Sequence, residues 1–123
     1  MKFKSPHMKD QLEDCSMALQ AVAAFADRCS KDLCDREIII TRVTDAVDGE
    51  SGVHPAKRAF DCRYQTSGGY YYTHEEAEMI RDKVNERFPR KDNRVTCMIH
   101  SFNGGMEHFH LQIPFDIPKE WGV

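Results

Sequence analysis

Two short segments of the sequence carry side chains that could bind a metal ion. His54 and Asp61 stand seven residues apart, and His108 and His110 stand two residues apart near the C-terminal end. Zinc takes three or four ligands drawn from His, Cys and carboxylates, and a catalytic zinc keeps one position open for water. Because side chains alternate along a strand, His108 and His110 are expected on one face. The two segments therefore predict a metal site where they converge.

Glu107 stands directly before the histidine pair and adds a carboxylate that could serve as a general base. Strand alternation directs it away from His108 and His110, so it joins them only where the start of the strand is bulged or twisted. The nearby Gly104 and Gly105 permit such a bulge. The alternative interpretation has no metal at all, with these side chains as polar surface residues.

Composition and charge exclude several classes of protein. Hydrophobic residues make up 41% and charged residues 30% of the chain, which is ordinary for a soluble globular domain. The net charge of -3 with His neutral gives no overall basic field that would attract nucleic acid or anionic lipid. The five cysteines lack C-x-x-C spacing, which indicates reduced thiols rather than a zinc knuckle or a disulfide framework. We therefore expect no nucleic-acid partner.

The length of 123 residues predicts a single domain, residues 1–123, without internal repeats or linkers. The first residues are basic, but no apolar run follows them that could serve as a signal peptide. No stretch approaches the ~20 apolar residues that cross a bilayer. We therefore expect a protein made in the cytoplasm, without its own export signal or a membrane span. The oligomeric state stays open.

Two helices are expected to support the site. Ser5 suits an N-cap and Pro6 the first helical position, and apolar residues then recur at three- and four-residue intervals. This stripe predicts one helix from about residue 8 to about residue 30. Thr73 and Glu76 form a capping box that opens a second helix, which stops before Pro89.

Four strands are predicted where β-branched or alternating apolar residues gather, at residues 38–43, 59–64, 95–100 and 107–113. His54 lies in a predicted loop, residues 45–55, and turns are expected at residues 67–69 and 104–105. Residues 70–72 should continue in extended form, and the tail, residues 114–123, should lie over the core. His100 could approach the site from a strand end but is not predicted to bind the metal. The order α-β-β-α-β-β predicts an α+β fold, with a small antiparallel or mixed sheet and flanking helices.

The spacing of these residues resembles a known family. The pattern S-x-x-H-x-x-x-x-A-x-D runs from Ser51 to Asp61, and E-x-x-H follows some fifty residues later at Glu107 to His110. It is similar to the pattern of the D-alanyl-D-alanine metallopeptidases, which form a larger group with lysostaphin-type peptidases and the hedgehog signalling domain. The resemblance covers roughly residues 36–113. It implies the zinc fold that this group shares.

The resemblance also implies a role for each matching residue. His54, Asp61 and His110 match the zinc ligands, and Glu107 matches the catalytic base of E-x-x-H. The lysostaphin branch has H-x-H instead, in which the first His, here His108, assists catalysis.

An Arg near the end of the preceding strand often polarises the substrate carbonyl in this family. Arg42 is the nearest candidate for that role, although it lacks the usual S-G-Y-R setting.

The activity that the resemblance implies is zinc-dependent hydrolysis of a peptide bond. Zinc lowers the pKa of bound water to about 7, and Glu107 would take its proton. The implied substrate and partner is a cell-wall peptidoglycan peptide, cut at a D-amino-acid-containing bond by a carboxypeptidase or an endopeptidase. A single domain without an export signal would suit a phage endolysin or a virion-associated lysis protein.

The chain departs from the family pattern at two positions. Lys57 stands where the family usually has Gly, three residues after the first His, and Phe109 stands where Trp is common. A side chain at Lys57 could narrow the cleft or change the loop. The alternative function is therefore a non-catalytic zinc-binding module, structural or binding, such as a virion protein on the same fold.

Overall fold

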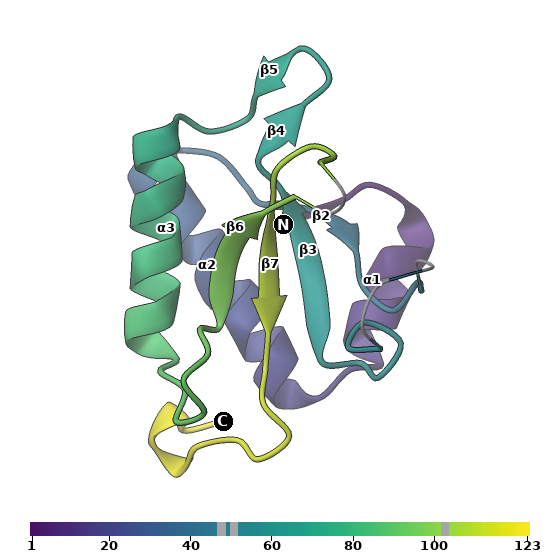
Figure 1. Ribbon diagram of the computed structural model, residues 1–123, viewed down its shortest axis with the longest axis vertical. Coiled ribbons are helices and arrows are strands. Elements are labelled where there is room, and N and C mark those ends of the chain that lie inside the picture. The colour runs from purple at the N-terminus through teal and green to yellow at the C-terminus, as the bar shows by residue number, and fades with distance from the viewer. Residues whose placement is uncertain (47–48, 50–51, 102–103) are drawn as a thin grey trace.

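The structure is a computed structural model that describes residues 1–46, 49, 52–101 and 104–123. Within these residues the chain forms an α+β fold of three helices, a five-stranded mixed sheet and a small two-stranded hairpin (Figure 1). The predicted α+β class, a mixed sheet with flanking helices, is confirmed. None of the helices described is long and apolar enough to cross a bilayer.

The central sheet contains the four predicted strands, each slightly shorter than expected. They are β2 (Ile39–Arg42), β3 (Ala59–Arg63), β6 (Cys97–His100) and β7 (His108–Gln112). A fifth strand, β1 (Lys2–Phe3), pairs in parallel with β2, whereas all other pairs are antiparallel, in the order β1-β2-β3-β7-β6. A two-residue strand has no periodicity to detect, which is why β1 was not predicted.

The two faces of the sheet differ in chemistry because side chains alternate along each strand. Phe60, Cys62, Phe109 and Leu111 are buried in the main hydrophobic cluster, on the face covered by the helices. In Figure 1 the long helix α2 (Met17–Cys34) passes behind the sheet, and α3 (His74–Arg87) lies along the side of β6. The residues between these apolar positions therefore face away from the helices.

The prediction of one helix over residues 8–30 is wrong, because the chain forms two helices there. The first, α1 (Pro6–Glu13), ends at Asp14, and α2 begins after Ser16. Ser16 has an extended backbone, and its hydroxyl accepts a hydrogen bond from the Leu19 N–H at 3.3 Å. The apolar stripe continues across this break, since Leu12, Cys15 and Leu19 are all buried in the core. Periodicity alone therefore concealed the new N-cap.

The second predicted helix is confirmed, including its capping box. In α3 the Glu76 N–H donates to the Thr73 hydroxyl at 3.1 Å, and the Thr73 N–H donates to the Glu76 carboxylate at 2.8 Å. Its buried residues, Ala77, Ile80 and Val84, face α2 and the sheet.

The remaining segments fit the predictions in part. The turn after β3 joins β4 (Gln65–Thr66) to β5 (Gly69–Tyr70), so the extended segment expected at residues 70–72 ends at Tyr70. The tail lies over the core as expected, and its short 3-10 helix (Lys119–Trp121) buries Trp121 against Phe88 at a ring-centroid distance of 5.1 Å. Val47, Asp48, Glu50 and Ser51 of the predicted loop lie outside the described residues.

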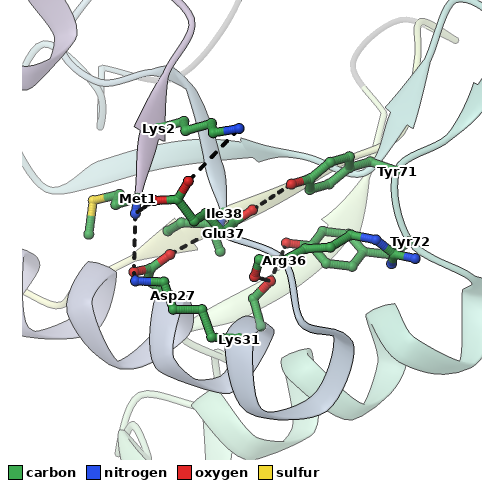
Figure 2. Close-up of polar contacts among 10 residues, drawn as sticks. Met1, Lys2, Asp27, Lys31, Arg36, Glu37, Ile38, Tyr71 and Tyr72 are labelled. Atoms are coloured by element: carbon green, nitrogen blue, oxygen red, sulfur yellow. Dashed lines mark hydrogen bonds and ion pairs between the residues drawn. The ribbon is translucent and has the colours of Figure 1, made fainter.

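A buried carboxylate ties α2 to the start of β2 (Figure 2). Asp27 accepts the Ile38 N–H at 3.0 Å and pairs with Lys31 at 2.9 Å and with the Met1 ammonium at 3.2 Å. Burial by itself raises the pKa of the Asp27 carboxyl, but hydrogen bonds from these three donors outweigh it and hold the pKa below its ordinary value. The ionised form of Asp27 therefore stabilises the fold.

Replacing Asp27 by Asn should show this contribution as a pH-dependent loss of stability. Asn keeps an oxygen for the Ile38 N–H but loses the charge, so Asp27→Asn should unfold about 1–2 kcal/mol more easily near neutral pH. Because the folded-state pKa is depressed, the wild-type advantage is complete above the unfolded-state pKa of about 3.9 and is lost as pH falls through the folded-state pKa. Urea unfolding over this range measures it.

The exposed Asp32 on the same helix provides the matched control, and Asp32→Asn should change the free energy of unfolding by less than about 0.5 kcal/mol. A deficit in Asp27→Asn that stays constant from neutral to acid pH would contradict the role given to the charge.

Candidate metal centre

The structure brings His54, Asp61 and His110 together. One potential ligand atom from each residue lies within 4.8 Å of those of the other two. All three residues are buried, with exposed fractions of 1%, 6% and 8%. The predicted convergence of the two segments is confirmed, and this cluster could bind a metal ion.

Strand register places two of the three residues. Asp61 on β3 stands directly opposite His110 on β7, within five consecutive residue pairs that show no register shift. Both side chains lie on the face turned away from the helices, since their neighbours Phe60 and Leu111 are in the core. The carboxylate Oδ1 of Asp61 lies 2.9 Å from Nδ1 of His110.

His54 reaches the same point from the turn before β3. Backbone hydrogen bonds from Lys57 N–H to the His54 carbonyl at 2.9 Å and from Arg58 N–H to the Val53 carbonyl at 3.1 Å hold this turn. Lys57 has a φ of 63°, in the left-handed region that favours glycine. This explains physically why a glycine would suit the position. The Lys57 ammonium pairs with Asp14 on the surface, and the side chain does not line the cavity of the site.

The contacts of His54 determine which of its two ring nitrogens carries a hydrogen. Its Nδ1 lies 2.8 Å from the Val43 carbonyl oxygen, which can only accept, so Nδ1 carries a hydrogen. In the neutral ring Nε2 then presents a lone pair, and it has no hydrogen-bond partner among the described residues. It faces Asp61 Oδ1 at 3.4 Å. Two buried acceptors that face each other require a cation or a proton between them.

His110 is arranged in the same way. Its Nε2 lies 3.1 Å from Gln112 Oε1 and can donate to it, so the Nδ1 of the neutral ring presents a lone pair to Asp61, whereas the Nδ1 of the protonated ring donates to that carboxylate. Burial lowers the pKa of His110, but hydrogen bonds to Asp61 and Gln112 outweigh burial and raise it. Burial likewise raises the pKa of Asp61, and the hydrogen bond from the protonated His110 ring and the nearby imidazole of His54 reverse this and lower it. Asp61 is therefore an ionised carboxylate in the site.

This donor set fits zinc in its chemistry. Two imidazoles and one carboxylate are the ligand types of catalytic zinc sites. Each imidazole also has its second nitrogen bound by an outer partner, the Val43 carbonyl for His54 and Gln112 for His110. Such partners orient metal-binding histidines in known sites.

Two further predicted residues line the cavity of about 220 Å³ beside the cluster. His108 Nε2 lies 3.5 Å from Asp61 Oδ2, and Arg42 Nε lies 3.7 Å from the same oxygen. His108 is on the same face as His110, as strand alternation predicted. Both residues thus contact the carboxylate from outside the three-residue cluster.

His100 also lines this cavity, in agreement with the expectation that it could approach the site from a strand end without binding the metal. It stands directly opposite His108 in the β6–β7 pair, with ring centroids 4.7 Å apart, and its ring lies 5.3 Å from that of His110. It is not one of the three residues that could hold the metal. Only the register of two strands brings it here, and no local motif signals that register.

Glu107 is the predicted site residue that the structure does not bring into the cavity. The pairing of β7 with β3 is regular from His108 onward, and Glu107 precedes β7. Glu107 instead lines two neighbouring pockets, one with Tyr64 and Tyr70 and the other with Arg63, Asp61 and His108.

Comparison with protein-family models, with curated proteins and with solved structures finds no match for the chain.

Metal analysis tests the cluster directly. The purified protein should bind about one zinc per chain, and His54→Ala and His110→Ala should each abolish stoichiometric binding. Zinc at about 1,000 times its dissociation constant should stabilise the fold by about 4 kcal/mol and raise the Tm by about 10 °C or more. Elemental analysis and thermal unfolding with and without a chelator measure both effects.

His74 provides the control, because its side chain is 71% exposed on α3. His74→Ala should keep full zinc binding. Equal zinc content in the wild type and in both ligand variants would refute the assignment.

Proposed function

We propose that the chain is a zinc-dependent hydrolase of peptide bonds, with His54, Asp61 and His110 as zinc ligands. The observation that carries this proposal is the buried pair of acceptors, His54 Nε2 and Asp61 Oδ1, facing each other at 3.4 Å. A site whose only task was structural stability would gain more from apolar side chains than from buried acceptors turned toward each other. A cavity adjoins the cluster, so a substrate has access.

Bound zinc would polarise a substrate carbonyl and lower the pKa of a water molecule to about 7. The chain itself supplies the proton acceptor. His108 lines the cavity, and its side chain is 23% exposed, so it can exchange a proton with both the reacting groups and solvent. Its Nε2 lies 3.5 Å from Asp61 Oδ2, and this contact orients the ring in the cavity. From the same position, His108 can then deliver this proton to the leaving amine.

Arg42 supplies a positive charge near the same carboxylate oxygen of Asp61. Its guanidinium lines the cavity, and its side chain is only 14% exposed, so its charge acts through little solvent. A carbonyl oxygen that gains negative charge during hydrolysis would be stabilised by this group. Asp61 in turn keeps Arg42 in position.

This assignment gives His108 the role of base in preference to Glu107. His108 lines the cavity of the metal cluster, whereas Glu107 lines only the pockets beside it. The chain thus fits the H-x-H version of the motif better than the E-x-x-H version. The substrate suggested by the motif resemblance is a peptidoglycan peptide with a D-amino-acid-containing bond, as cut by a phage lysis enzyme.

The position of Glu107 also favours a second candidate function. A non-catalytic zinc-binding module on this fold needs the three ligands but no general base. In that case the metal would stabilise the loop of His54 against the sheet, and the chain would serve as a structural or binding module.

A hydrolysis assay with purified muropeptides and zinc separates the two functions. The wild type should release a cleavage product. His108→Ala should lower kcat/KM by about 10²–10⁴-fold, as expected for loss of a general base, and Glu107→Ala should lower it by less than about tenfold. Product analysis by mass spectrometry also identifies the bond that is cut.

His74→Ala serves as the surface control here as well and should retain wild-type activity. A protein that binds zinc stoichiometrically but releases no product would favour the non-catalytic module. A larger loss in Glu107→Ala than in His108→Ala would overturn the choice of base.

A further inference from the structure

A second pocket adjoins the metal cavity on the same face of the sheet. It has a volume of about 340 Å³ and shares Arg42, Asp61 and His108 with that cavity. Beyond these residues its lining includes Lys4 and Arg63. The volume falls within the range of about 300–1,000 Å³ that is usual for small-molecule sites. The two cavities therefore form one continuous depression that extends away from the metal cluster.

Strand geometry sets how far the new pocket lies from the metal ligands. Arg63 follows Asp61 by two residues on β3, so the two side chains share a face about 7 Å apart along the strand. Arg63 also stands directly opposite His108 in the β3–β7 pair. Lys4 follows β1, where its N–H donates to the Ile40 carbonyl at 2.8 Å. Both cations are therefore attached to the sheet rather than to a loop.

The charges of the pocket are not balanced. Three cationic side chains and two carboxylates line it: Lys4, Arg42, Arg63, Asp61 and Glu107. Arg42 pairs with Asp61, but no carboxylate in the described part of the chain forms an ion pair with Lys4 or Arg63. Asp61 is also turned toward the two imidazoles of the cluster. The side chains that line the pocket thus carry a net charge of +1. The two cations without an ion-pair partner lie about two residues along the sheet from the metal cluster.

We propose that this pocket binds a carboxylate group of the substrate, held by Arg63 and Lys4. The proposal rests on the function proposed above, because it places the scissile bond at the metal cluster. Arg presents a planar fork of donors that matches a carboxylate, and Lys adds a point charge. An extended peptide covers about 7 Å in two residues, so the carboxylate belongs within about two residues of the scissile bond. It is either the C-terminal carboxylate or an acidic side chain.

Binding of small uncleavable probes tests this pocket without relying on activity. The probes are N-acetyl-D-alanine, its amide, and the α-amide of N-acetyl-D-glutamic acid, which carry a terminal carboxylate, no carboxylate and a side-chain carboxylate. NMR titration of the zinc-loaded protein gives their dissociation constants. At least one carboxylate probe should bind about tenfold more tightly than the amide, and the preferred one identifies the source of the carboxylate.

Arg63→Gln and Lys4→Gln should each weaken the preferred probe by about five- to tenfold and leave the amide unchanged. Arg28→Gln, an exposed position on α2, is the control and should have no effect. A wild type that does not prefer a carboxylate over the amide would overturn the proposal. A preference for the carboxylate that both Arg63→Gln and Lys4→Gln retain would also overturn the proposal.

The same titration separates this proposal from the metal assignment. If the carboxylate preference disappears in His54→Ala but persists in Arg63→Gln, the carboxylate binds at the metal cluster, and the pocket of Arg63 and Lys4 is refuted while the metal site stands. If zinc content does not depend on His54, the proposed function fails, whatever the effect of Arg63→Gln.

Discussion

The pairing of β3 with β7 is the constraint on which the whole site depends. It sets Asp61 opposite His110 and Arg63 opposite His108, and it turns all four side chains to the same face. A shift of one residue in this register would turn these four side chains toward the core and bring core residues to the open face. The apolar residues of the other face prevent that shift, because it would move them out of the core. Packing behind the sheet therefore determines the chemistry in front of it.

The site carries an energetic cost that this core must offset. A carboxylate and two imidazoles are removed from water, and two acceptor atoms are turned toward each other. Burial of a charge costs several kcal/mol unless it is well paired. Such an arrangement is typical of a ligand-binding site. The outer contacts of His54 and His110, to Val43 and Gln112, already hold both rings in orientation. Little further ordering is then needed on metal binding.

The structure changes the interpretation of two positions in the sequence motif, Lys57 and Glu107. Lys57 occupies a left-handed backbone position, so the glycine expected there reflects backbone conformation and not the width of the cleft. Its side chain leaves the site and pairs with Asp14. Glu107 precedes β7 and lines the pockets of Tyr64 and of Arg63, not the cavity of the metal cluster. The open face of the sheet thus offers His108 near the cluster and cations farther along.

The sequence by itself determined the elements and the candidate ligands. β-branched runs predicted the strands, Thr73 and Glu76 predicted the second helix, and the spacing of His54, Asp61 and His110 predicted a shared site. These signals are local, so no knowledge of the fold is needed to detect them. The break at Ser16 also has a local signal, the N-cap hydrogen bond from the Leu19 N–H, but the continuous apolar stripe concealed it. Tertiary structure alone decided the rest: the added strand β1, the arrival of His100 and Arg63, and the exclusion of Glu107 from the cavity. Each depends on strand register or on packing between distant segments, and neither is encoded in the spacing of residues along the chain.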